Sequence, residues 1–224
     1  MRRSSTFWQN FLFDLDGTLV NSSPIHERAF RATLGKFRVD LLPQFSYPAI
    51  KAKTTREAFR SLGIVDEAEL DEMVADKQRS FRDAVDRHEL GPMPCALELL
   101  ADLKRATKRL FVVSSGSGLS VSKTLEATGL ARYFEQVITA DDVERGKPAP
   151  DAFLLCLSRF ALDPTASVVV EDAKAGVMAA RDAGLAVIAV HDHSIAGQAD
   201  IFLEDFATFR RWLTQPSAQV ITKR

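Results

Sequence analysis

The sequence predicts an α/β protein, with a doubly wound, mostly parallel sheet and a small α-helical cap inserted after the first strand. Three features of the sequence support this prediction. Short apolar runs recur along the chain, and stretches with helical spacing separate them. The runs show little polar alternation, as expected of strands that are buried on both faces of a parallel sheet. One region near the N-terminus contains helical patterns but no convincing strand.

The expected strands are short and rich in Val, Phe and Ile. They are predicted at Trp8–Phe13, Leu110–Val113, Gln136–Ile138, Val168–Val170 and Ala186–Val190. Between them, apolar stripes with helical spacing lie over 96–103 and 121–130, and a final pattern places Phe206, Phe209 and Trp212 on one face. Strands and helices in alternation indicate βαβ units, in which crossover helices join parallel strands.

Residues 22–89 interrupt this alternation. Their three charged amphipathic patterns are His26–Leu34, Thr55–Leu62 and Glu67–His88. Gly91-Pro92-Met93-Pro94 closes the region, because proline and glycine end helices and mark linkers. We therefore expect a helical cap at 22–89 and an α/β core formed by 1–21 together with 90–224.

The composition is that of an ordinary globular protein with no bias toward a charged partner. The chain has 224 residues, and its 29 Lys+Arg and 30 Asp+Glu give a net charge of −1. This balance provides no electrostatic reason to expect nucleic acid or an anionic membrane as a partner. Apolar stretches such as Leu185–Val190 are far shorter than the ~18 residues of a membrane span. No apolar segment follows Arg2 and Arg3 before Asp14, so we expect no signal peptide.

The cysteine and histidine residues give weaker signals. Cys95 and Cys156 form no CxxC or pairing pattern, so we expect reduced core thiols in a cytoplasmic protein. His191 and His193 follow the last expected strand without a matching set of metal ligands. We therefore expect them in a solvated loop.

An acidic pair follows the first expected strand, in Phe11-Leu12-Phe13-Asp14-Leu15-Asp16-Gly17-Thr18-Leu19. In open α/β sheets, ligands bind beyond the carboxyl ends of the strands. Two neighbouring carboxylates repel unless a cation lies between them or one is protonated. Asp14 and Asp16 can therefore supply a nucleophile or metal ligand and a general acid/base. A plain acidic turn at Asp16-Gly17 is the alternative.

A second acidic pair, Glu171-Asp172, follows the apolar run Val168-Val169-Val170. Carboxylates from two strand ends form an oxygen-ligand site for a hard cation, for which Mg²⁺ is the expected metal. The alternative interpretation is that the pair caps the following helix and complements its dipole.

Two further loops add polar groups to the same edge of the predicted sheet. Ser114-Ser115-Gly116-Ser117-Gly118 follows a strand and precedes a helix, an arrangement that collects hydroxyl and N–H groups for a phosphate. It lacks the third glycine of a dinucleotide-binding loop. In Arg145-Gly146-Lys147-Pro148-Ala149-Pro150-Asp151, the prolines and glycine restrict the backbone around Lys147. A flexible turn and an exposed basic turn are the alternatives.

In this order, the four motifs resemble those of the haloacid dehalogenase superfamily, specifically its branch of sugar-phosphate phosphatases and β-phosphoglucomutases. The resemblance extends from Phe11 to about Val190. It implies a Rossmann-like core whose cap closes over the site and excludes water. It also implies that Asp14 is the nucleophile that forms an aspartyl-phosphate, and that Asp16 is the general acid/base.

The resemblance also implies the binding residues. Ser115, with Gly116 in the same loop, and Lys147 would bind the phosphoryl group. Mg²⁺ would be held by Asp14, Asp172, Glu171 and the backbone carbonyl of Asp16.

Three cap residues are candidates for substrate contact under the same resemblance: His26, Arg56 and Lys77. Each lies in a charged helical pattern, where a solvated face is the alternative. The mutase pattern has glycine three residues before the arginine, whereas this chain has Lys53. This difference weakens the mutase interpretation.

The function expected from the sequence is a Mg²⁺-dependent phosphatase that acts on a small phosphorylated metabolite, a sugar or polyol phosphate. A β-phosphoglucomutase-type phosphotransferase is the alternative. A phospho-receiver-like signalling or binding protein is a third, weaker hypothesis. The oligomeric state is left open.

Overall fold

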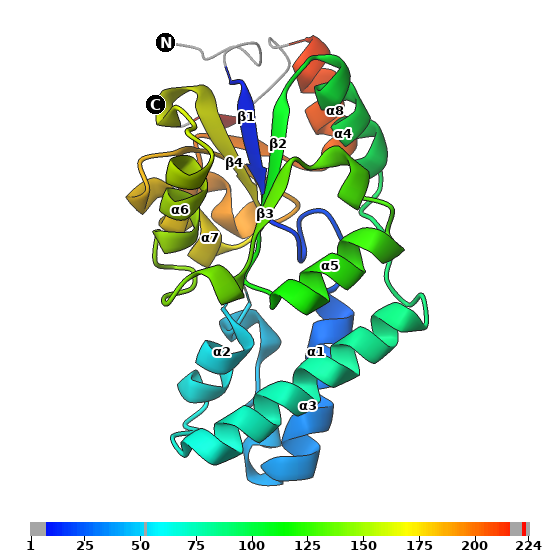
Figure 1. The fold of residues 1–224 in the computed structure, drawn as a ribbon, viewed down its shortest axis with the longest axis vertical. Coiled ribbons are helices and arrows are strands. Elements are labelled where there is room, and N and C mark those ends of the chain that lie inside the picture. Colours follow the sequence, from blue (N-terminus) through cyan, green and yellow to red (C-terminus); the bar gives the residue numbers. More distant parts are fainter. Residues whose placement is uncertain (1–7, 52, 216–220, 223–224) are drawn as a thin grey trace.

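A computed structural model describes residues 8–51, 53–215 and 221–222, and within them the strands form one seven-stranded sheet (Figure 1). The strand order is β3-β2-β1-β4-β5-β6-β7, and only the last pairing is antiparallel. The strands are β1 Asn10–Phe13, β2 Arg109–Val113, β3 Gln136–Ile138, β4 Ser167–Glu171, β5 Ala186–Val190, β6 Ile201–Leu203 and β7 Ile221–Thr222. The predicted doubly wound, mostly parallel α/β sheet is confirmed.

All five predicted strands are present, with small differences at their ends. β1 begins at Asn10 rather than Trp8, although Gln9 N still donates to Ala166 O at 2.8 Å. β6 and β7 were not predicted, because runs of three and two residues carry too little periodicity to be identified as strands.

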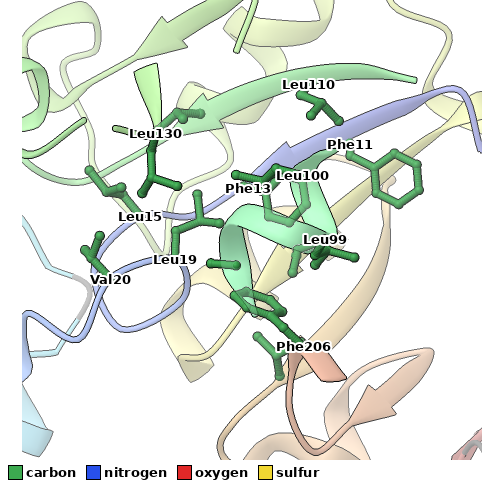
Figure 2. Close-up of a cluster of buried hydrophobic side chains, with 14 of the residues drawn as sticks. Phe11, Phe13, Leu15, Leu19, Val20, Leu99, Leu100, Leu110, Leu130 and Phe206 are labelled. Atoms are coloured by element: carbon green, nitrogen blue, oxygen red, sulfur yellow. The ribbon is translucent and has the colours of Figure 1, made fainter. Parts of the chain in front are cut away.

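Helices cover both faces of the sheet, and the alternation of side chains along each strand decides which helices it contacts. In β1, Phe11 and Phe13 face one apolar cluster, whereas Leu12 faces the other. The first face is covered by α4 (Ala96–Arg105), α5 (Gly118–Ala127) and α8 (Phe206–Thr214); Figure 2 shows Leu99, Leu100 and Phe206 beside Phe11 and Phe13. The second face is covered by α6 (Asp151–Arg159) and α7 (Lys174–Asp182). Burying each large apolar side chain contributes about 1.5–3 kcal/mol.

The three helical patterns between β1 and β2 form α1 (Ser23–Phe37), α2 (Thr55–Ser61) and α3 (Glu67–Asp86), which group at one end of the molecule (Figure 1). Short 3₁₀ segments at Val39–Gln44 and Tyr47–Ala49 connect α1 to α2. These helices have an apolar core of their own, which includes Phe30, Leu34, Phe59, Leu70 and Met73. The cap therefore has an apolar core of its own, and only its near end, with Ile25, Phe81 and Val85, joins the apolar cluster of the sheet.

The two segments that join the cap to the sheet lie side by side. Val20 pairs with Pro92 in an isolated antiparallel bridge, and Met93 N donates to Leu19 O at 2.8 Å. Because both connections pass through one short region, they form a narrow junction between cap and core.

The two cysteines differ in burial. Cys156 is fully buried and Cys95 only half-buried, so the expectation of two core thiols holds for Cys156 alone; both are free. Among the described residues, no helix combines the length and apolar character that crossing a bilayer requires.

Candidate active site

The carboxyl ends of three neighbouring strands meet at one point. Asp14 follows β1, Ser114 follows β2, and Glu171 ends β4. β1 lies between β2 and β4 with parallel pairing on both sides, so their ends are level. Asp14 N donates to Val170 O at 3.0 Å, which extends this register one residue beyond the strand.

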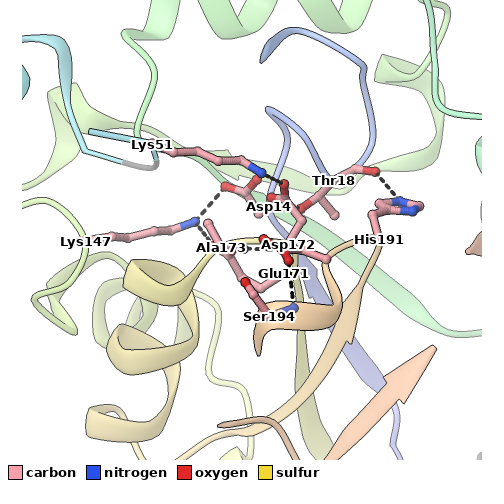
Figure 3. Close-up of polar contacts among 10 residues, drawn as sticks. Asp14, Thr18, Lys51, Lys147, Glu171, Asp172, Ala173, His191 and Ser194 are labelled. Carbon is pink, nitrogen blue, oxygen red and sulfur yellow. Dashed lines mark hydrogen bonds and ion pairs between the residues drawn. The ribbon is translucent and has the colours of Figure 1, made fainter. Parts of the chain in front are cut away.

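Three buried carboxylates form an acid cluster: Asp14, Glu171 and Asp172 each offer one oxygen, and these oxygens lie within 4.8 Å of one another. Figure 3 shows how they converge. Burial and repulsion from Asp14 raise the pKa of Glu171. Burial also raises the pKa of Asp172, with Lys51 opposing the shift and Asp14 adding to it. A cluster of oxygen donors with this excess of negative charge suits a hard divalent cation such as Mg²⁺.

Lys147 lies inside this cluster, and its side chain is only 1% exposed. Its Nζ donates to Asp14 Oδ1 at 2.7 Å, to Glu171 Oε1 at 2.6 Å and to Val113 O at 2.9 Å. Burial disfavours its charge, but Asp14 and Glu171 outweigh burial and raise the pKa of Lys147. The side chain is therefore a permanent cation beside Asp14.

A second lysine, Lys51, reaches the cluster from the cap and was missed by sequence reasoning. Its ammonium forms an ion pair with Asp172 Oδ2, and Thr18 Oγ1 donates to Asp172 Oδ1 at 3.0 Å (Figure 3). Burial disfavours the charge of Lys51, yet attraction by Asp172 raises its pKa. Gly17, with φ +92°, makes the turn that leaves room for the Asp172 carboxylate. No sequence pattern marks Lys51, because its position depends on how the cap is oriented.

The carboxylate of Asp16 is not part of the acid cluster. Its Oδ1 lies 3.0 Å from His26 Nε2. Burial would raise the pKa of Asp16, but His26 lowers it below its ordinary value. Asp16 is thus held ionised near the cluster, while its side chain faces the cap.

His26 connects Asp16 to a buried lysine of the cap. Lys77 Nζ lies 2.8 Å from His26 Nδ1, and the His26 ring stacks on Phe81 with 4.1 Å between centroids. Burial lowers the pKa of Lys77 to about 8, and burial together with Lys77 lowers that of His26. A protonated lysine can only donate, so Nδ1 accepts and the ring proton lies on Nε2, toward Asp16.

The loop after β2 forms the floor of a cavity of about 60 Å³ that also contains Asp14 and Asp16. Ser115 and Gly116 both line it. Gly116 N donates to Ser114 Oγ at 3.0 Å, so Ser114 stabilises the loop internally. A Cβ at position 116 would lie 2.9 Å from Val121 Cγ2, so glycine lets this loop pack tightly.

The cap and α5 of the core supply the other walls of this cavity. His26 and Lys77 line it, and their contact with substrate stays a prediction; Tyr47, Lys53 and Gln78 line it without having been predicted. Tyr47 and Gln78 belong to no motif, whereas Lys53 occupies the position that is glycine in the mutase pattern, and tertiary packing brings all three to the cavity. Arg56 does not line the cavity. Its guanidinium pairs with Glu67 and Asp71 elsewhere on the cap, and its expected role in substrate contact remains a prediction.

His191 is half-buried beside the site and not in a solvated loop. Its Nε2 lies 3.1 Å from Thr18 O, and its ring meets Phe206 edge-on with 4.8 Å between centroids. The imidazole therefore supports the turn that follows Asp16. His193 is exposed, as expected.

Comparison with known proteins identifies a family model that matches this chain. The model, described as haloacid dehalogenase-like hydrolase, matches residues 11–190, which include all four motifs.

Two curated relatives and one solved structure are also similar to this chain over most of its length. Fructose-1-phosphate phosphatase YqaB of Escherichia coli (strain K12) is 32% identical over 82% of this chain and 96% of its own length. Hexitol phosphatase A of the same organism is 36% identical over 82% of this chain and 83% of its own. The crystal structure of CbbY from Rhodobacter sphaeroides in complex with phosphate superposes with a TM-score of 0.76 at 25% identity, covering 89% of this chain and 95% of that one.

Proposed function

The chain belongs to the haloacid dehalogenase-like hydrolases, and we propose that it hydrolyses the phosphate ester of a small sugar or polyol in the presence of Mg²⁺. The family and the phosphatase relatives make it a hydrolase that acts on phosphate esters. The observation that supports the proposed chemistry best is the position of Asp14, which lies beside a buried lysine and within an acid cluster suited to a cation.

Asp14 is the proposed nucleophile. Its carboxylate would attack phosphorus in line with the departing sugar oxygen, and the resulting aspartyl-phosphate divides one difficult displacement into two. The hydrogen bond of 2.7 Å from Lys147 Nζ to Asp14 Oδ1 orients the carboxylate.

Asp16 is the proposed general acid and base. In its protonated form it would donate its proton to the leaving oxygen, and the carboxylate left behind would later accept a proton from the water that attacks the aspartyl-phosphate. The contact with His26 supports this role, because it keeps Asp16 beside the cavity and away from the acid cluster. Lys77 orients the ring of His26 in turn.

Phosphoryl oxygens would be bound by Ser115, by the backbone around Gly116 and by Lys147. A Mg²⁺ held by Asp14, Asp172, Glu171 and the Asp16 carbonyl would offset the repulsion between carboxylates and phosphate. The residues fit this ion, because three buried oxygen donors lie within 4.8 Å of one another. The chain's own contribution is to hold these donors close together in a buried pocket.

The proposed substrate class rests on the cavity lining and on the relatives. Beyond Asp14 and Asp16, the cavity presents polar side chains, including Lys53, Gln78 and Thr124, that can hydrogen-bond the hydroxyls of a leaving group. Two relatives are named for fructose 1-phosphate and for hexitol phosphates. A small polyhydroxylated leaving group therefore agrees with both observations.

The β-phosphoglucomutase alternative is not favoured, because both relatives described above are named as phosphatases. The position that is glycine in the mutase pattern is Lys53, which lines the cavity.

The decisive experiment is a screen of sugar and polyol phosphates with Mg²⁺ and with EDTA, in which released inorganic phosphate is measured. We expect Mg²⁺-dependent release that Asp14→Asn abolishes. Full activity of Asp14→Asn would overturn the proposed mechanism. Conversion of β-glucose 1-phosphate to the 6-phosphate without release of phosphate would instead support the mutase alternative.

A further inference from the structure

The first turn of α2 in the cap contacts the loop that carries Lys147. Glu57 Oε1 accepts a hydrogen bond of 3.2 Å from Gly146 N, across 89 residues of sequence. The other oxygen of Glu57 accepts from Thr54 N at 3.0 Å and Thr54 Oγ1 at 2.8 Å, which completes the capping box of α2. One carboxylate therefore both starts a cap helix and holds that helix to the core. We refer to this arrangement of Thr54, Glu57 and Gly146 as the docking contact.

The docking contact is close enough to require glycine at position 146. A Cβ there would lie 2.6 Å from Thr54 Cγ2 and 2.8 Å from Glu57 Oε2. Both distances are shorter than non-bonded atoms tolerate, so an alanine would displace α2 or the loop. Gly146 is buried, so neither side can move outward without opening the interface.

The docking contact also lies one peptide away from the phosphoryl-binding lysine. Gly146 precedes Lys147, whose Nζ reaches Asp14, Glu171 and Val113 O. A shift of the Gly146 backbone therefore moves the base of the Lys147 side chain. At the other end of the contact, Thr55 begins α2 and lines the cavity. The contact thus joins a cap wall of the cavity to the lysine loop.

We propose that Glu57 is a positioning residue, which places Lys147 correctly only when α2 is docked on Gly146. The inference rests on the proposed function only in assigning Lys147 to the phosphoryl group. Undocking of α2 would then open the cavity to substrate, and docking would close it and place the lysine loop in the same movement. Closure of the cap and assembly of the site become a single event.

The first test is Gly146→Ala, which keeps the N–H donor and the capping box but adds the obstructing Cβ. We expect kcat/KM for the best sugar phosphate to fall about 10- to 100-fold, because small misplacements of binding groups have effects of this size. Backbone amides of residues 54–61 should exchange with deuterium faster than in the wild type. Gly197→Ala is the matched control, because nothing lies within 4 Å of the Cβ it adds.

A second substitution tests the geometry directly. In the Gly146→Ala background, Thr54→Ser removes the methyl group nearest to the new Cβ and keeps the capping hydroxyl. We expect kcat/KM of the double variant to be at least about threefold higher than that of Gly146→Ala, and the amide protection of residues 54–61 to return in part. Glu57→Ala should resemble Gly146→Ala, whereas Glu57→Gln, which retains an acceptor oxygen, should be milder.

The inference is overturned if Gly146→Ala has wild-type kinetics and wild-type amide exchange over 54–61. It is also overturned if activity is lost while exchange is unchanged and Thr54→Ser restores nothing. Amide exchange needs no substrate, so it decides whether α2 docks on Gly146 even if the wild type hydrolyses no sugar phosphate. That last result would overturn the proposed function separately.

Discussion

His26 and Lys77 share a hydrogen bond of 2.8 Å, and it joins a buried amine of the cap to the carboxylate of Asp16 in the core. The Lys77 side chain lies over the rings of Phe30 and Phe81, at 4.7 and 5.4 Å from their centroids. These apolar surroundings are the physical reason that burial lowers the pKa of Lys77 to about 8. A group that titrates near neutral pH therefore orients the side chain that contacts the proposed acid/base.

The contact between Lys77 and His26 predicts that activity falls at alkaline pH. Above pH about 8, Lys77 loses the proton that it donates to His26, and the imidazole no longer has a fixed tautomer. We expect kcat/KM to decline above this pH. Lys77→Arg should move the decline upward by more than one pH unit, because a guanidinium stays protonated. The pH dependence of kcat/KM, measured for the wild type and for Lys77→Arg, tests this prediction. A decline at the same pH in both proteins would contradict it.

Lys77 should also leave a signature in the pH dependence of stability. Its pKa falls from 10.5 when exposed to about 8 when buried. Between these values the unfolded chain binds more protons than the folded one, so the free energy of unfolding rises with pH, by at most about 3 kcal/mol. Urea unfolding at pH 8 and pH 10 tests this, with Lys77→Met as the comparison. The variant should show a smaller rise than the wild type, and an equal rise would refute the assignment.

Lys51 should weaken the binding of Mg²⁺. Its ammonium pairs with Asp172, an expected metal ligand, so the metal has to displace it or share the carboxylate. We expect Lys51→Met to bind Mg²⁺ about three- to tenfold more tightly, the effect of losing a partly exposed ion pair. Isothermal titration calorimetry gives the dissociation constants. Lys53→Met, with the same change two residues away, should have the smaller effect, and equal effects would point to overall charge instead.

Gly176 should be essential for the acid cluster. A Cβ at this position in α7 would overlap the carboxylate of Glu171, whose oxygens already bond Lys147 and the backbone N–H of Ala173. Although alanine favours helices, we expect Gly176→Ala to lower the free energy of unfolding by about 1–3 kcal/mol, because overpacking outweighs propensity. Mg²⁺ affinity should fall at the same time. Chemical unfolding and calorimetry measure both; Gly197→Ala should change neither.

Much of the fold and part of the site could be predicted from the sequence, for a local reason. An apolar run that ends in acidic, hydroxyl or glycine residues marks the carboxyl end of a buried strand, and parallel pairing brings such ends together. Asp14, Glu171 and Asp172 form the cluster that this logic requires. Lys147 reaches the cluster from a loop whose motif was also recognisable.

The remaining features depend on the packing of the cap against the core. The direction in which Asp16 points is decided by His26, the place of Lys51 by the orientation of the cap, and the partners of Arg56 by the surface of α3. None of these contacts has a periodic or local signal in the chain.

The sequence alone therefore establishes a parallel α/β core, a helical insertion and the strand ends where the acidic, hydroxyl and lysine groups collect. Tertiary structure decides which cap residues meet them, including the contact between Glu57 and Gly146. The physical reason is that strand ends follow from hydrogen-bond register and alternation, which neighbouring residues encode. Contacts between cap and core depend instead on how two separately packed clusters of side chains fit together, and that fit arises from the whole chain.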